Sequence, residues 1–146
     1  MTEMHELLLN AWLRLSTSIN NARLVSEMTF NESLICNILY NHSKASDGTI
    51  ITATDLCNMT NMLKSQMNRT LNNMEEKGLI FRKRSEKDKR QVFVSMNMEN
   101  AKVYEQQHKN VLKFVDAMLE KVGKDKAEEI VQLFTLISNK AKEVMD

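Results

Sequence analysis

The chain has 146 residues, 42% of them hydrophobic, which is enough for a single domain with a substantial core. It contains no apolar run long enough to cross a membrane and no signal-peptide pattern, so we expect a cytoplasmic protein with no membrane partner. Its two cysteines, Cys36 and Cys57, form no Cys-x-x-Cys pair, and we expect small core residues rather than a disulfide.

The net charge is only +1, but the charges are unevenly distributed. Residues 64–90 carry nine basic and four acidic side chains, a net of +5, whereas the rest of the chain carries eleven and fifteen, a net of −4. A basic segment of this size is typical of a protein that binds a polyanion, and a dimer built through the acidic remainder would present two such segments.

The first part of the chain predicts two helices. In residues 5–26, apolar side chains recur in steps of three and four, which indicates an amphipathic helix with one narrow apolar stripe. Its members are Leu8, Trp12, Leu15, Ile19 and Ala22. The sequence Thr29-Phe30-Asn31-Glu32 is a capping box, and the helix that it opens is expected to bury four apolar side chains. These are Leu34, Ile35, Ile38 and Leu39.

Two shorter helices joined by a sharp turn are predicted next. Thr52 and Asp55 form a second capping box, and Leu56 and Met59 give the first helix of the pair an apolar edge. Asn61 suits the turn because asparagine tolerates a positive φ better than most residues. This pattern is typical of a helix-turn-helix.

The second helix of this pair has one apolar and one polar face. Leu63 has no side chain that could cap a helix, so we expect the helix to begin at Ser65 and to end at Gly78. Met67, Leu71 and Met74 fall at helical spacing and should face the core. The opposite face carries side chains that suit base edges, because Arg can pair with guanine and Asn or Gln with adenine. They are Ser65, Gln66, Asn68, Arg69 and Asn72.

Residues 78–97 predict a β-hairpin with a basic loop. Apolar side chains recur at every second position of each arm, so each arm is expected to be a half-buried strand. They are Leu79 and Phe81 on one arm and Val92, Val94 and Met96 on the other. The loop, residues 85–90, is solvated and rich in Lys and Arg. Helix, turn, helix and basic hairpin in this order indicate a winged helix-turn-helix that binds DNA.

Residues 98–146 predict two further amphipathic helices, separated by a break at residues 122–124. Their stripes are Tyr104, His108, Val111, Val115, Met118 and Val122, then Ile130, Phe134, Ile137, Ala141 and Val144. These helices and the first one could form a monomeric bundle or pack against a second copy of the chain. We expect a homodimer, because two-fold symmetry lets a DNA-binding protein recognise two half-sites.

The run from Asp55 to Asn97 resembles the winged helix-turn-helix of the MarR family of bacterial transcriptional regulators. The resemblance rests on the helix exit Met74-Glu75-Glu76-Lys77-Gly78-Leu79-Ile80, on the Arg82 that follows it, and on Asp88-Lys89-Arg90 in the loop. Where the family usually has Leu-Thr after the wing, this chain has Met96-Asn97, which keeps one apolar residue and one helix-capping residue.

The resemblance implies a mainly α fold with a small β-hairpin wing. A winged helix-turn-helix reading head over about residues 30–97 would be flanked by dimerisation helices over about residues 5–26 and 98–146. In this family the wing arginine, here Arg90, enters the minor groove, and Asp88 holds its guanidinium in place. The implied contacts with double-stranded DNA are Ser65, Gln66, Asn68, Arg69 and Asn72 on the helix and Arg84, Lys87, Asp88, Lys89 and Arg90 in the wing.

Members of this family are most often homodimeric repressors that bind pseudo-palindromic operators. They commonly lose DNA affinity when a small, often aromatic anion binds between the dimer helices and the reading head. The resemblance therefore implies a transcriptional regulator with a small-molecule effector, which nothing in the sequence identifies. No Gly-rich phosphate loop, nucleophile elbow or placed carboxylate pair indicates an enzyme or a cofactor.

Two alternatives stay open. A zinc-responsive branch of the family has ligands in roughly the regions of His42 and His108, and Glu27 or Glu105 could add an oxygen ligand. Because these residues are not clustered in the sequence as metal ligands usually are, we assign no metal site. The other alternative is a helical protein-protein interaction module that has lost DNA binding, and the basic wing argues against it.

Overall fold

The computed structural model describes residues 2–21, 28–45 and 48–145. The predicted stripe member Ala22, the rest of the segment 22–26 and the candidate ligand Glu27 therefore lie outside the described residues. The elements are α1 (Thr2–Asn21), α2 (Phe30–Ala45), β1 (Ile51–Thr52), α3 (Ala53–Thr60), α4 (Lys64–Glu76), β2 (Ile80–Arg84), β3 (Val92–Met96), η1 (Met98–Asn100), α5 (Ala101–Val122), η2 (Lys124–Lys126) and α6 (Ala127–Met145), where η1 and η2 are short 3₁₀ turns.

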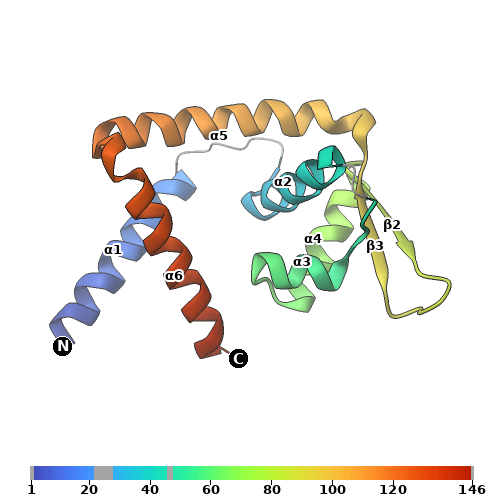
Figure 1. Ribbon diagram of the computed structural model, residues 1–146, viewed down its shortest axis with the longest axis horizontal. Helices are drawn as coiled ribbons and strands as arrows, with labels where there is room; N and C mark the ends of the chain where they lie inside the picture. The colour runs from blue at the N-terminus through green and yellow to red at the C-terminus, as the bar shows by residue number, and fades with distance from the viewer. Residues whose placement is uncertain (1, 22–27, 46–47, 146) are drawn as a thin grey trace.

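The long helix α5 connects two differently built regions of the molecule (Figure 1). Helices α2, α3 and α4 and the sheet lie beneath one end of α5, and α1 and α6 lie at its other end. The predicted hairpin is present as β2 and β3, and the short strand β1 adds a third strand, so the antiparallel sheet has the order β1-β3-β2. None of the described helices is long and apolar enough to cross a bilayer.

Local sequence signals account for where α2 and α3 begin. The Thr52 hydroxyl accepts a hydrogen bond from the Asp55 backbone N–H at 3.1 Å, and the Asp55 carboxylate accepts one from the Thr52 N–H at 2.9 Å. Thr29 and Glu32 form the same reciprocal pair at the start of α2, at 3.1 and 2.8 Å. Both predicted capping boxes are therefore present. Asn61 ends α3 at φ 62°, the left-handed conformation expected of it.

The start of α4 corrects the prediction by one residue. The helix begins at Lys64 rather than Ser65, with Leu63 in an extended conformation at the N-cap position and no side-chain capping bond. The Leu63 carbonyl accepts the first helical bond, from the Met67 N–H at 2.8 Å. A backbone carbonyl is sufficient to start a helix, and the uncapped N–H groups can bind water because this end is exposed.

The core lies under the sheet and between α2, α3 and α4. The largest fully buried side chains are Ile35, Leu56, Met67, Leu71, Met74, Ile80, Glu32 and Cys36. Both cysteines are free. Cys36 is buried and Cys57 packs at the edge of the core. Burial, with a smaller contribution from the nearby charge of Glu32, raises the pKa of the Cys36 thiol to about 12, so this thiol is protonated and unreactive.

Three side chains that we expected inside are exposed: Leu34 at 42%, Met59 at 59% and Phe81 at 58%. Leu34 lies on the opposite side of α2 from the buried Cys36, because two residues along a helix differ by about 200°. Met59 lies in the last turn of α3, next to the turn at Asn61.

Phe81 pairs with Ser95 and so shares the outer face of the sheet. Ile80, which pairs with Met96, is buried instead. Because side chains alternate across a strand, the expected phase of this arm was wrong by one residue.

Candidate nucleic-acid interface

The polar face of α4 is exposed as predicted from its spacing. Met67, Leu71 and Met74 are buried and fix the rotation of the helix about its axis. The predicted base readers Ser65, Asn68, Arg69 and Asn72 are exposed, and Gln66 is half-buried. The helix therefore presents a row of short polar side chains and one arginine to the solvent, which is suited to the major groove of DNA.

One predicted base reader already has a partner within the protein. The Arg82 guanidinium donates to the Asn72 side-chain oxygen at 2.6 Å and to both Glu75 carboxylate oxygens at 3.1 and 3.3 Å. This contact joins α4 to β2, and the hydrogen bond from Arg82 lowers the pKa of the Glu75 carboxyl. Arg82 takes one of the two lone pairs of the Asn72 oxygen, whereas both N–H donors of Asn72 stay available to a base. In this conformation a two-bond pair with adenine would have to share that oxygen with Arg82.

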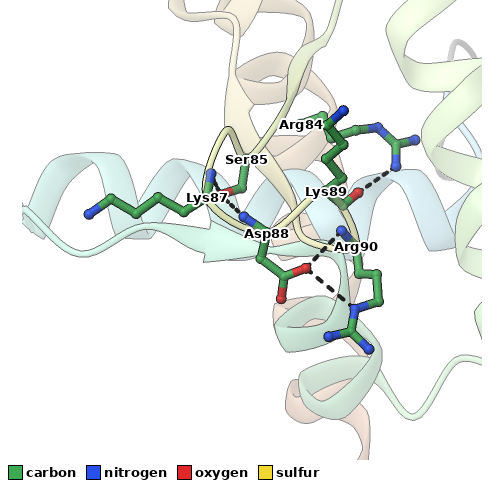
Figure 2. A network of polar contacts seen from close by, with 6 residues as sticks. All are labelled: Arg84, Ser85, Lys87, Asp88, Lys89 and Arg90. Atoms are coloured by element: carbon green, nitrogen blue, oxygen red, sulfur yellow. Dashed lines mark hydrogen bonds and ion pairs between the residues drawn. The ribbon is translucent and has the colours of Figure 1, made fainter.

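The loop between β2 and β3 is held by a buried serine and an aspartate (Figure 2). The Ser85 hydroxyl, in a residue only 7% exposed, accepts hydrogen bonds from the backbone N–H groups of Lys87 and Asp88, both at 3.2 Å. Asp88 Oδ1 accepts from the Arg90 backbone N–H at 3.0 Å and from Arg90 Nε at 3.4 Å. The Arg90 side chain is 93% exposed. It is therefore both oriented and available to a ligand.

Of the other wing cations, Arg84 bonds within the wing, and the two lysines extend into the solvent. Arg84 Nη1 donates to the Lys89 backbone carbonyl at 2.5 Å, which ties the end of β2 to the tip of the loop. The side chain of Lys87 extends away from Arg84 and Arg90 in Figure 2. Lys87 and Lys89 are exposed, as phosphate-contacting lysines must be.

The polar face of α4 and the wing share one cavity of about 360 Å³. Asn68 reaches it from α4 and Arg84 and Arg90 from the wing, so three predicted site residues lie together. Lys64, which the sequence argument did not select, contributes a third cation to the same cavity. The rest of the lining is Ala53, Thr54, Cys57, Met67 and Val92. A concave surface lined by three cations is suited to a polyanion.

Residues 19–110, more than half of the chain, match the family model of the transcriptional regulators SarA and Rot. The chain belongs to the SarA/Rot family. At the sequence level, no match to a curated protein was found.

Solved structures with a similar fold are transcriptional regulators. CouR, a transcriptional repressor bound to a 23-mer DNA duplex, has a TM-score of 0.76 and 19% identity, and the match covers 93% of this chain and 95% of CouR. BldR from Sulfolobus solfataricus has a TM-score of 0.72 and 22% identity, with 94% and 96% covered. NadR in complex with 4-hydroxyphenylacetate has a TM-score of 0.63 and 25% identity, with 92% and 89% covered.

These neighbours are MarR-type regulators, so the MarR-type winged helix-turn-helix fold predicted from the sequence is confirmed. The family assignment makes this SarA/Rot protein a DNA-binding transcriptional regulator, and its family and neighbours are regulators rather than enzymes.

The histidines of the zinc alternative have other contacts. His42 Nε2 lies 2.6 Å from the Thr49 backbone carbonyl, and the His108 ring stacks on Tyr104 with centroids 5.3 Å apart. Glu105 accepts a hydrogen bond from the Tyr40 hydroxyl at 2.6 Å. Within residues 2–21, 28–45 and 48–145, no group of three or more His, Cys, Asp or Glu side chains is arranged to hold a metal ion.

Sequence reasoning missed the residues that position the predicted contacts. Arg82 was noted only as part of a family pattern, and Ser85 and Gln91 were not singled out at all. The Ser85 N–H donates to the Gln91 carbonyl at 2.9 Å, and the Gln91 N–H donates to the Asp88 carbonyl at 2.9 Å. Alternation along the strand gave the wrong face for Arg82, because the predicted phase had Leu79 and Phe81 inside. In the structure Arg82 pairs with the buried Val94 and shares the inner face of the sheet with Ile80.

Proposed function

We propose that this SarA/Rot family protein is a homodimeric repressor that binds a pseudo-palindromic operator. In each protomer, α4 enters the major groove and Arg90 enters the adjacent minor groove. The observation that carries this proposal is the cavity that Asn68, Arg84 and Arg90 share, because it makes the polar face of α4 and the wing one continuous basic surface. A duplex can then contact both elements at once.

The roles of the wing residues follow from their geometry. Arg90 keeps its charge exposed while Asp88 restrains its backbone and its Nε, so less conformational entropy is lost on insertion. Narrow A·T-rich minor grooves concentrate negative potential and attract such a cation. Lys87 and Lys89 contact phosphates, which gives affinity without sequence preference.

The face of α4 supplies sequence preference. Arg69 is the residue suited to guanine, and Gln66 and Asn68 are suited to adenine. Asn72 donates from its amide while Arg82 holds its oxygen, so Asn72 favours base acceptors such as the O4 of thymine or the N7 of a purine. The proposed operator is A·T-rich with an isolated G·C pair in each half-site.

The terminal helices support the homodimer. No described residue of α1 or α6 is buried, although both carry large apolar side chains. Trp12 is 61% exposed, Phe134 56% and Ile137 50%. Large apolar side chains exposed along two whole helices indicate an interface, and a second copy would bury both helices.

Repression and effector release are supported by the neighbours. CouR is a transcriptional repressor and NadR was solved with 4-hydroxyphenylacetate. We propose that a small anion also binds the dimer of this protein, and that its binding lowers the affinity for the operator. Adding 4-hydroxyphenylacetate to the operator complex is the first test, and affinity that no small aromatic acid lowers would contradict effector control.

The decisive experiment is selection of bound duplexes from a random DNA pool, followed by affinity measurements on the enriched site. Arg90→Ala should weaken binding about tenfold or more, because it removes a charge-assisted contact worth roughly 1.5–3 kcal/mol. Asp88→Ala should weaken it less, because the arginine keeps its charge and loses only its orientation.

The matched control is Lys121→Ala, which removes one exposed cation from the last turn of α5, the end of the helix that lies away from the wing in Figure 1. It should leave operator affinity unchanged. Equal affinities for the Arg90 variant and the wild type would refute the wing assignment, and a pool without any enriched palindrome would refute the homodimeric operator complex.

A further inference from the structure

Several hydrogen bonds meet at Lys77 and Gly78, at the end of the proposed recognition helix α4, and we call this place the junction. The Leu79 N–H donates to the Met74 carbonyl at 2.9 Å, and the Gly78 N–H donates to the Glu75 carbonyl at 3.0 Å. These two bonds with Gly78 at φ 75° form a Schellman motif, which ends a helix at a defined residue. The position and direction of the backbone at Lys77 and Gly78 are therefore fixed relative to α4.

A buried carboxylate attaches the start of α2 to this junction. Glu32 is only 2% exposed, and its Oε1 accepts from Lys77 Nζ at 2.7 Å and from the Thr29 backbone N–H at 2.8 Å. Its Oε2 has no hydrogen-bond partner. Such an ion pair contributes little net stability, because desolvation of the carboxylate offsets the attraction. An interaction of this kind can instead specify one arrangement of the elements that it joins.

The start of α5 is attached to the same junction from the other side. The Gly78 carbonyl accepts hydrogen bonds from Asn97 Nδ2 at 2.9 Å and from Asn100 Nδ2 at 2.8 Å. A Cβ at position 78 would lie 3.0 Å from Asn100 Nδ2, so any other residue here would require the Asn100 amide to shift. Asn97 precedes the short turn η1, and Asn100 is its last residue, directly before α5.

The junction therefore lies where both routes to the terminal helices meet the reading head. Thr29 directly precedes α2, the element that follows α1 in the chain, and Asn97 and Asn100 lie between β3 and α5. We infer that Glu32, Lys77, Gly78 and Asn100 set the angle between the recognition helix and the terminal helices, and thereby the half-site spacing that the dimer accepts. This inference rests on the proposed homodimeric operator complex.

DNA geometry explains why the angle must be accurate. One helical turn takes about 10 base pairs, so adding one base pair between half-sites rotates one of them by roughly 35° about the axis. A head held rigidly on its dimer helices loses affinity when the half-sites are rotated. A head that can pivot recovers part of that affinity.

Two variants loosen the junction from its two sides. Glu32→Gln removes the ion pair but keeps a side-chain oxygen for the Thr29 N–H, and Lys77, 43% exposed, can be solvated. Asn100→Ala removes the exposed amide from the Gly78 carbonyl without altering the core. The matched control is Glu76→Gln, which makes the same charge change at the exposed residue beside Lys77.

The experiment measures the affinity of each dimer for duplexes that carry the selected half-sites at the selected spacing and at spacings one and two base pairs longer or shorter. The wild type should prefer one spacing. Both junction variants should reduce that preference by about fivefold or more, the lower end of coupling between distinct sites. Their affinity for a duplex with a single half-site should stay within about twofold of the wild type, as for independent sites.

Three outcomes would overturn the inference. Variants that keep the wild-type spacing preference would show that the junction does not set the angle. A parallel loss on the single half-site would show that the junction only stabilises the head. A wild type that binds no palindromic duplex would refute the proposed function as well, whereas the first two outcomes leave it intact.

Discussion

The reading head and the terminal helices differ in how they satisfy their apolar side chains. Among the described residues, all buried hydrophobic side chains except Ala101 and Tyr104 lie between Met28 and Met96. Helices α1 and α6 contribute none. The head therefore contains its own core, whereas the terminal helices have amphipathic sequences whose apolar faces are not covered within one chain. The stability of the head should therefore not depend on protein concentration, whereas that of the terminal helices should rise with it.

The largest expected effect tests the core of the head. Leu71 is 1% exposed, so Leu71→Ala should lower the free energy of unfolding by about 2–5 kcal/mol, through lost burial and the cavity left behind. Urea denaturation measures it. The contrasting variant Phe134→Ala, at a side chain 56% exposed in one chain, should lower stability only where dimers form. If Phe134→Ala lowered the free energy of unfolding equally at low and high protein concentration, the contrast between the two regions would be wrong.

The second prediction concerns the dimer contact of the terminal helices. Ile137→Glu places a charge on the apolar face of α6 and should raise the dissociation constant of the dimer at least about tenfold, or roughly 1.4 kcal/mol. Sedimentation across a concentration series measures it. Thr135→Glu adds the same charge about 200° away around the same helix and should leave the dimer unchanged. If the dissociation constant were unchanged in the Ile137 variant, this face of α6 would not belong to the dimer interface.

The order of the elements and the buried face of α4 could be predicted, because both depend on residues that are close together in the sequence. The two capping boxes, the left-handed Asn61 and the C-terminal Gly78 each specify a backbone conformation through neighbouring residues, and all are present in the structure. The same holds for the wing, where Asp88 contacts Arg90 only two positions away.

Contacts between residues distant in sequence could not be predicted in this way. The pairing of Lys77 with Glu32 spans 45 positions, and no periodicity relates them. The strand phase at Phe81 was wrong because Leu79 belongs to the helix exit rather than to the strand, which shifts the alternation by one. The occupied oxygen of Asn72 depends on the register of β2 against α4, which only the folded chain shows.

The third prediction concerns the boundary between the two regions. Gly78→Ala should cost about 1–2 kcal/mol, because an L-residue is strained at φ 75°. The new methyl group would also meet Asn100 Nδ2 at 3.0 Å. Gly48→Ala is the matched control, since Gly48 has φ 77° with nothing within 4 Å of the added Cβ. Thermal unfolding should show a larger loss for Gly78→Ala, and equal losses would mean that the contact with Asn100 yields freely.

The smallest expected effects test whether the head is specified by local capping. Thr52 caps α3 reciprocally with Asp55, so Thr52→Ala should lower the free energy of unfolding by about 1 kcal/mol. α4 has Leu63 at the same position, 65% exposed and without a capping bond, so Leu63→Ser should raise it by roughly 0.5–1 kcal/mol. One variant thus removes an N-cap side chain and the other adds one, so their effects on stability should have opposite signs. Denaturant midpoints at a fixed slope measure both effects. If Leu63→Ser instead destabilised the protein, the exposed leucine would have to contact something that the single chain does not contain, and the head would be less self-contained than its core indicates.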